Sequence, residues 1–394
     1  MKKIILLFIL LFCICGCWNY KELDDYSIIT GISIDKSDDT YEVSVLISNA
    51  SKSSGESPDS SQSKSVLYSS KGNSIFKALK DIALISPKEL YLDHFSILVI
   101  SEEIAKEGIY NVVDFFLRYP NSRKDFSVAI AKDCKAKDTL KIITPITDFP
   151  SQSIADNLMF STNLQGTISN VNYNELIYNL IAPGKEVVMN SIKIIGDKKE
   201  GSKSENIESS EPKTYLKLSN LAIFKDDKFV SWTSEEESYG INIINDKTTE
   251  MYIKIKINDG YVVVNPVNFK TDIKVKFKNT KPQISIIASG NAKIMEVNGK
   301  IDLANNYVIE EIQKKANEKI KNYIKKGIKV ASDNETDIFG FGLKIYKNNP
   351  DYFNKIKKDW NKDLKNLDIK TKSDLIIKSI SSTQNSVEVL DDKK

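Results

Sequence analysis

The chain has 394 residues and carries 56 Lys and Arg against 53 Asp and Glu, which gives a formal net charge of only +3. These charges are spread along the sequence without long single-sign blocks, so nothing indicates a nucleic-acid-binding protein. The length predicts two or three domains.

The first residues have the pattern of a secretory signal. Lys2 and Lys3 precede an apolar run at residues 4–12, and Gly16 stands directly before Cys17. Nine apolar residues are too few for a transmembrane helix, which needs about 20. Ile14 and Gly16 before Cys17 resemble the lipobox of bacterial lipoproteins. We therefore predict that residues 1–16 are a lipoprotein signal peptide and that Cys17 is lipidated, which holds the body on the extracytoplasmic face of a membrane. The alternative is an ordinary cleaved signal with free secretion.

Cysteine and histidine are too scarce for most metal or nucleophilic sites. With Cys13 and Cys15 removed and Cys17 lipidated, Cys134 is the one thiol left, and His94 is the one histidine. One thiol cannot form an intramolecular disulfide, and a single Cys and His cannot complete a structural zinc site. We predict no metal and no cofactor, and a structural role for His94 with its imidazole hydrogen-bonded at the end of a strand.

Residues 17–144 form the first predicted domain, in which strands and helices alternate. The helix after Asn73 or Ser74 places Ile75, Leu79 and Ile82 on one face, and a second helix carries apolar residues from Ile109 to Phe116. A serine-rich stretch at 51–65 predicts a long loop. The predicted strands are 28–35, 41–47, 66–69, 95–100 and 126–131.

Residues 145–246 form the second predicted domain, after a segment at 142–150 that contains two prolines and no clear period. Ser234 with Glu237 is the pattern of a capping box that starts a helix. Residues 197–213 have almost nothing apolar to bury, which predicts a low-complexity insertion or linker. The other predicted elements are helices at 154–160 and 173–180, a strand at 191–195, and a hairpin of 215–224 with 228–232.

Residues 247–394 form the third predicted domain. Apolar residues alternate with lysine in three strands that begin near Met251, which indicates an antiparallel sheet with one buried face. A helix over 304–326 has the apolar spacing to cover that face. A helix from Pro350, capped by Asn349, and a closing strand at 369–380 follow. The fold class is therefore predicted as α+β, with three mixed domains that each have a sheet flanked by helices.

Three groups of residues deserve a test as catalytic candidates. The segment from Phe339 to Gly342 lacks the spacing of a phosphate-binding loop and predicts a chain reversal with buried phenylalanines. The carboxylates at 235–237 are typical of a solvated helix start, and Trp232 of a core residue or a partner contact. No catalytic set emerges, although a pair of glycosidase carboxylates stays open.

Four segments together resemble the Ger(x)C family of spore germination lipoproteins. They occur in the order of the family and span nearly the whole chain, with Asn220 in place of a usual glycine. The segments are CWNYKELDDYSIITGISID (17–35), LDHFSILVISEEIAKEGIYNVVDFFLRYPNSR (92–123), LSNLAIFKDDKFVSWTSEEESYGI (218–241) and DIFGFGLKIYKNNPDYFNKIKKDW (337–360).

The resemblance implies a three-domain α+β lipoprotein on the outer surface of the inner spore membrane. It would be the C subunit of a nutrient germinant receptor, assembled with integral-membrane subunits of A and B type. The family pattern brings no catalytic residue, and Cys17 is the single site carried over. Two alternatives stay open, namely a solute-binding lipoprotein of a transporter and a cell-wall hydrolase.

Overall fold

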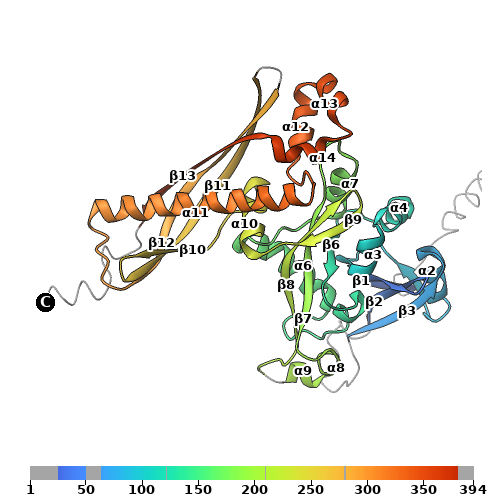
Figure 1. Cartoon of the computed structure of the whole chain (residues 1–394). Coiled ribbons are helices and arrows are strands. Elements are labelled where there is room, and N and C mark those ends of the chain that lie inside the picture. Colours follow the sequence, from blue (N-terminus) through green and yellow to red (C-terminus); the bar gives the residue numbers. More distant parts are fainter. Residues whose placement is uncertain (1–24, 50–63, 121, 209, 279–280, 380–394) are drawn as a thin grey trace, which may run out of the picture.

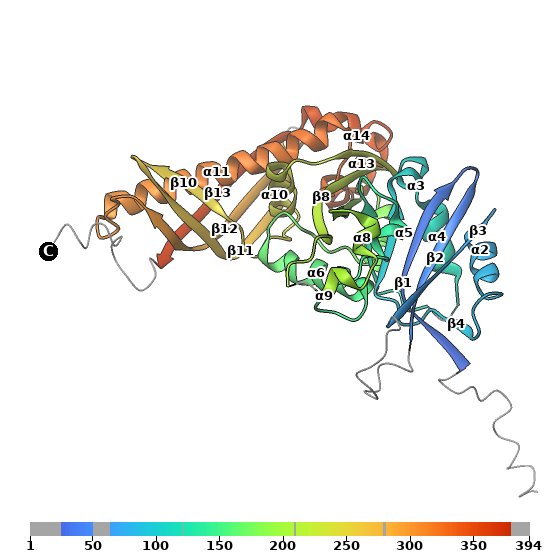
Figure 2. The same cartoon turned by 90° about the horizontal axis from the view of Figure 1, so that it is seen from below.

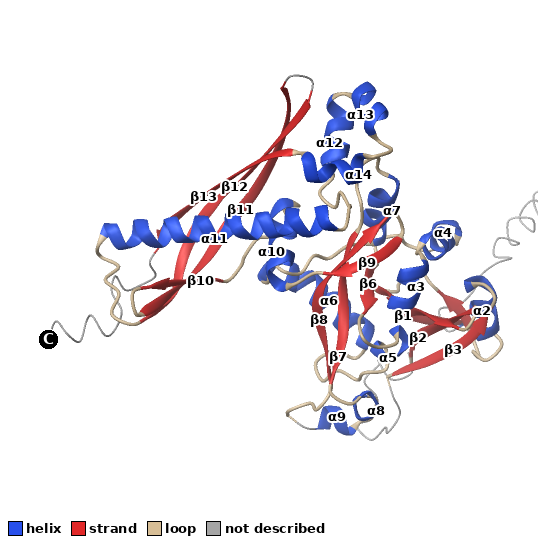
Figure 3. Ribbon diagram, in the orientation of Figure 1, coloured by secondary structure: helices blue, strands red, loops and turns tan. Residues whose placement is uncertain are grey.

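The computed structural model describes residues 25–49, 64–120, 122–208, 210–278 and 281–379 (Figure 1). It has a wide first region built on a nine-stranded sheet and an elongated last region built on a four-stranded sheet (Figures 1 and 3). Residues 1–16, Cys17 and the tail at 391–394 lie outside the described residues, as does nearly all of the predicted serine-rich loop. The α+β fold class predicted from the sequence is confirmed.

The first sheet is mixed, with a parallel centre and antiparallel sides. Its order is β3-β2-β1-β5-β6-β7-β8-β9, and β4 pairs in parallel with the start of β1. The strands β1, β5, β6 and β7 run parallel to one another. The bounds are β1 (Tyr26–Ser37), β2 (Thr40–Ser48), β3 (Ser65–Gly72), β4 (Glu89–Tyr91), β5 (Ile97–Ser101), β6 (Ser127–Ala131), β7 (Val188–Ile195), β8 (Tyr215–Lys225) and β9 (Lys228–Trp232).

Helices cover both faces of this sheet, which is why every residue of the central strands β5 and β6 is buried. Four helices pack on one face: α2 (Ile75–Ile82), α3 (Glu102–Glu107), α4 (Tyr110–Arg118) and α7 (Tyr173–Ile181). On the other face lie α5 (Ala136–Thr139) and α6 (Pro150–Leu164). Leu98 and Ile100 of β5 belong to the first core, and Ile97 and Val99 to the second.

The predicted boundary at 142–150 falls between two strands of this one sheet. Strands β6 and β7 are joined by only two residue pairs, Ile130 with Ser191 and Ala131 with Ile192. The first two predicted domains thus share a sheet through a narrow junction, and the division at residue 144 stays a prediction.

Residues 197–213 are folded more fully than their composition predicted. They contain two short helices, α8 (Lys198–Gly201) and α9 (Glu205–Glu208). Asn206 is buried, and its amide nitrogen donates to the carbonyls of Ile143 (3.1 Å) and Thr214 (2.8 Å). Hydrogen bonds from a buried asparagine can therefore hold a segment in place even when it has little apolar surface to bury.

The second sheet has the order β10-β11-β12-β13 and comprises β10 (Ile253–Ile257), β11 (Gly260–Lys278), β12 (Lys281–Asn298) and β13 (Asp368–Ser379). The first three strands are antiparallel, as predicted, whereas β13 joins β12 in parallel. Ile253, Ile255 and Ile257 are buried while Lys254 and Lys256 between them are exposed. The long helix α11 (Asn306–Asp333) lies along one face of this sheet (Figure 2) and buries Ile312, Ala316, Ile320 and Ile324.

Helix α10 (Glu235–Ile244) connects the two regions by crossing α11. Gly240 and Gly327 meet at the crossing, where a Cβ on Gly240 would lie 2.0 Å from the carbonyl oxygen of Tyr323. The rest of the last region is helical, with α12 (Phe341–Asn348), α13 (Pro350–Ile356), α14 (Trp360–Asp363) and the 3₁₀ helix η3 (Leu364–Asn366). The sequence predicted one helix from Pro350, and the structure divides it after Ile356. Within the described part of the chain, no helix has both the length and the apolar character needed to cross a bilayer.

Candidate functional site

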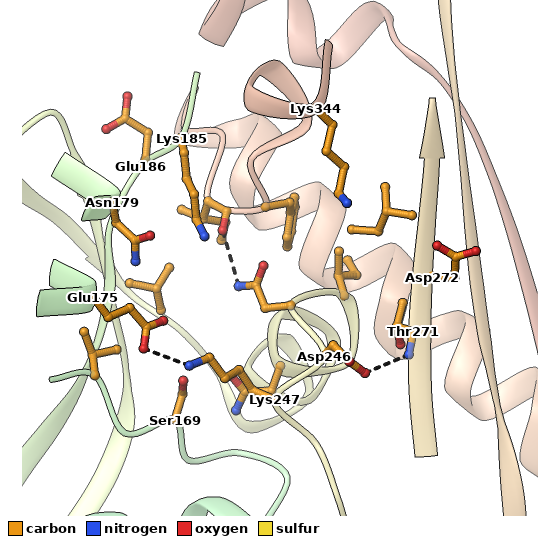
Figure 4. Close-up of a pocket in the computed structure, with 18 residues that line it drawn as sticks. Ser169, Glu175, Asn179, Lys185, Glu186, Asp246, Lys247, Thr271, Asp272 and Lys344 are labelled. Atoms are coloured by element: carbon orange, nitrogen blue, oxygen red, sulfur yellow. Dashed lines mark hydrogen bonds and ion pairs between the residues drawn. The ribbon is translucent and has the colours of Figure 1, made fainter. Parts of the chain in front are cut away.

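A cavity of about 350 Å³ lies where the first region meets the last (Figure 4). Its wall is assembled from α7, the segment before β7, the end of α10, the middle of β11, and the turn before α12 together with the start of α12. Val188, Ile244, Ile273 and Phe339 supply apolar wall. The polar residues that matter for its chemistry are Glu175, Asn179, Lys185, Asp246, Lys247, Thr271 and Lys344.

Part of this polar wall is internally paired. The Lys247 ammonium lies 2.9 Å from the Glu175 carboxylate, and the Asp246 carboxylate accepts the backbone N–H of Thr271 at 2.8 Å. Asp272, at the rim, lies 3.2 Å from Lys274 and its side chain is 61% exposed. Glu175 is thus neutralised by Lys247, and Asp246 is held by a backbone hydrogen bond.

The remaining polar groups have no partner among the described residues. Lys185 and Lys344 make no side-chain hydrogen bond or ion pair there, and Figure 4 shows both extending toward the same space. Asn179 is only 5% exposed, and its Oδ1 has no hydrogen-bond donor within the described chain. Thr271 Oγ1 is likewise unpartnered. A buried polar group without a partner is unfavourable for folding, and an ordered water, an ion or a ligand can supply the missing partner.

Positive charge gathers around Lys185. Burial lowers the pKa of the Lys185 ammonium, and the neighbouring charges of Lys247 and Lys344 lower it further, against the opposing effect of Glu175 and Asp337. Two ammonium groups, those of Lys185 and Lys344, therefore face the cavity without an ion-pair partner within the described residues.

Glu186 joins three segments at the edge of the cavity. Its carboxylate points away from the space in Figure 4, accepting the Asn361 amide at 2.7 Å and the Asp226 N–H at 2.8 Å. Burial raises the pKa of this carboxyl to about 7, although both hydrogen bonds oppose the shift. Asp226 adopts a φ of 57°, which an aspartate tolerates at the tip of the β8–β9 hairpin.

Asp337 organises the turn beside the cavity. It is fully buried, and its carboxylate accepts the N–H groups of Phe339 (3.3 Å), Phe341 (3.1 Å) and Gly342 (2.6 Å) and the Trp360 indole N–H (2.8 Å). Gly340 has a φ of 71°, and both phenylalanines are buried. The predicted chain reversal at 339–342 is confirmed, and Asp337 is the residue that sequence reasoning missed.

The other residues singled out from the sequence lie outside this cavity. His94 is exposed beside the Tyr91 ring (5.6 Å between centroids) and makes no hydrogen bond within the described residues, so the predicted strand-end bond is not observed. Cys134 is a free thiol whose pKa is raised by burial to about 11, which disfavours the reactive thiolate. Trp232 packs against Phe229 (4.6 Å) with Lys132 over its ring.

The acidic run at 235–237 has structural roles. Glu237 completes the capping box with Ser234, as predicted, and Glu236 pairs with Lys326 of α11. No group of three His, Cys, Asp or Glu side chains within the described ranges is arranged to hold a metal ion. The cavity itself could not be found from sequence, because five separate segments build it.

Comparison with known proteins places the whole chain among spore germination proteins. A model described as the spore germination protein N-terminal domain matches residues 19–194, and one described as spore germination B3/GerAC like, C-terminal, matches residues 219–381. Spore germination protein KC of Bacillus subtilis (strain 168) is 29% identical over 387 residues, covering 94% of each chain. Spore germination protein B3 of the same organism is 24% identical over 380 residues, covering 94% of this chain and 95% of that protein.

A solved structure shares the fold. The crystal structure of the GerBC protein matches 92% of this chain and 100% of its own, with a TM-score of 0.54 at 17% identity. The fold and the matched models thus define a spore germination protein. The chain belongs to the Ger(x)C family, the C subunits of nutrient germinant receptors, and the resemblance seen in its sequence is confirmed.

Proposed function

We propose that this chain is the lipid-anchored subunit of a spore nutrient germinant receptor, held through Cys17 at the outer surface of the inner spore membrane. It works by docking on integral-membrane subunits of A and B type, and it makes or breaks no bond in a substrate. Membership of the germination family supports the receptor role, and the residues before Cys17 support the anchor.

The observation that carries the docking proposal is an exposed apolar turn next to the first described strand. Leu84 and Ile85, just after α2, are 82% and 54% exposed. The hydroxyls of Ser86 and Ser27 lie 3.0 Å apart, which fixes this turn beside the start of β1. Cys17 precedes Tyr26 by nine residues, a length that spans at most about 30 Å. A lipid on Cys17 would thus hold the apolar turn close to the membrane and its proteins.

The anchor is tested with Cys17→Ala. The variant cannot receive a thioether-linked lipid, so we expect it in the soluble fraction or mislocalised, with its signal uncleaved. Fractionation and mass spectrometry of the N terminus measure both effects. A variant that stays tightly membrane-held, or a wild-type mature chain without acyl groups, would refute the anchor.

Docking is tested by placing charge on the apolar turn. The double variant Leu84→Asp and Ile85→Asp should stay folded and membrane-bound but recover much less of the A- and B-type subunits on purification. Tyr307→Asp is the matched control, since Tyr307 is also exposed (81%) but lies at the start of α11. Equal recovery from wild type, control and double variant would reject this surface.

The receptor role is tested in spores that lack paralogues of this chain. Deletion should leave spore formation intact and abolish germination with particular nutrients. Normal germination in every nutrient would contradict the proposal, and so would a measured turnover of any substrate by the purified protein.

A further inference from the structure

We infer that the cavity between the two regions binds a small organic acid that carries a hydrogen-bond donor besides its carboxylate, as hydroxy acids and amino acids do. The inference rests on the chemistry of the cavity and does not depend on how the protein is anchored. Its carboxylate would lie between the Lys185 and Lys344 ammonium groups, and its donor would bond to Asn179 Oδ1.

The charge of the ligand follows from which lysines are already neutralised. Lys247 has Glu175 at 2.9 Å, whereas Lys185 and Lys344 form no ion pair within the described chain. Both side chains are half-buried at the cavity, and two half-buried ammonium groups without a counterion favour an anion between them. A carboxylate fits the strong hydrogen bonds that ammonium groups donate.

The second recognition element follows from Asn179. Its Oδ1 is buried at the cavity wall and accepts nothing from the described residues, and an amide oxygen can only accept. Thr271 Oγ1 on the facing strand is also unpartnered. A ligand with a hydroxyl or ammonium group would supply the missing donor, and a plain fatty acid would not.

The size and the apolar wall limit the ligand to a small molecule. The volume of about 350 Å³ is at the lower end for ligand pockets in proteins, which range from about 300 to 1,000 Å³. Val188, Ile244 and Phe339 provide contact for a short carbon skeleton. A protein segment or an oligonucleotide would be too large.

A matched series of compounds tests the two recognition elements separately. Calorimetry on the full-length chain in detergent would use lactate, alanine, propionate and lactamide, with inorganic phosphate as the non-carboxylate anion. We expect lactate or alanine to bind, propionate to bind at least tenfold more weakly, and lactamide not to bind. If only lactate binds, the ligand group that donates to Asn179 is a hydroxyl. If only alanine binds, that group is an ammonium. Equal binding of propionate, binding of phosphate only, or no binding at millimolar concentration would overturn the inference.

Three variants then locate the binding. Lys185→Met and Lys344→Met should each weaken binding at least tenfold, and either one suffices if the other fails to fold. Lys329→Met is the control, because Lys329 is exposed and pairs with Asp333 on the surface of α11. Unchanged affinity in both cavity variants would refute the site.

Asn179→Leu separates a ligand-binding asparagine from a structural one. Removing an unpartnered buried oxygen should raise the Tm of the ligand-free protein, while binding of the acid is lost. If Asn179 instead has a structural role, the variant should have a lower Tm and still bind the acid. That result would overturn the role given to Asn179.

Discussion

The two sheets of this protein bury their side chains in different ways. In β5 and β6 every residue is buried, because helices cover both faces of the first sheet. In β10 buried isoleucines alternate with exposed lysines, because α11 covers only one face of the second sheet. The same element type therefore needs a continuous apolar run in one region and a strict alternation in the other.

The junction between the sheets is stabilised differently from either core. Apolar residues of β7 and β8 do reach the core of the last region, through Val188, Leu221 and Ile223. Beside the cavity, however, polar contacts join the segments and depend on two carboxylates, the fully buried Asp337 and the half-buried Glu186. The comparison predicts that mutations at the junction act through unsatisfied hydrogen bonds, and those in the sheets through lost packing.

Asp337→Ala should have the largest effect on stability. It leaves three N–H groups and the Trp360 indole without their acceptor, so we expect a loss of about 4 kcal/mol or more in the free energy of unfolding. Chemical denaturation measures it, with Asp363→Ala as an exposed control in α14. A loss no larger than that of the control would show that packing alone holds the junction.

Paired alanine substitutions test the difference between the sheets directly. In β12, Ile286 is fully buried and Ile287 is partly exposed on the other face. We expect Ile286→Ala to cost about 3 kcal/mol and Ile287→Ala less than about 1 kcal/mol. In β5, Val99→Ala and Ile100→Ala should both cost about 2 kcal/mol or more, since both are 0% exposed. If only one of these two β5 substitutions lowers stability, the first sheet does not have a core on both faces.

Glu186 makes the junction sensitive to pH. Its pKa is about 7 in the folded chain against 4.5 ordinarily, so the folded state retains a proton that the unfolded state releases. This stabilising contribution is fully present below pH 4.5 and is lost as pH rises through about 7. We expect Glu186→Gln to flatten the pH dependence of unfolding in this window by about 2 kcal/mol. If the free energy of unfolding of the variant depends on pH as steeply as that of wild type, another group titrates in this window.

Local patterns in the sequence predicted most elements but not how they associate. The alternation near Met251 and the buried face of 304–326 depend only on period, and the structure confirms them. The spacing of apolar residues does not determine which strands pair, so the sequence did not predict the parallel pairing of β13 with β12. Nor does it show the turn after Ile356, which divides the predicted helix while Phe353, Trp360 and Leu364 all stay buried. The cavity could not be predicted from the sequence either, because its residues meet only through tertiary packing.

The capping box of α10 offers the smallest effect, on the helix that links the two regions. Ser234 Oγ accepts the Glu237 N–H, and the Glu237 carboxylate accepts the Ser234 N–H at 2.7 Å. Ser234→Ala removes the first of these bonds and should cost about 1 kcal/mol. Ser289→Ala, at an exposed position of β12, is the control and should change stability by less than about 0.5 kcal/mol. If both variants unfold like wild type, the crossing of α10 with α11 fixes this helix without its cap.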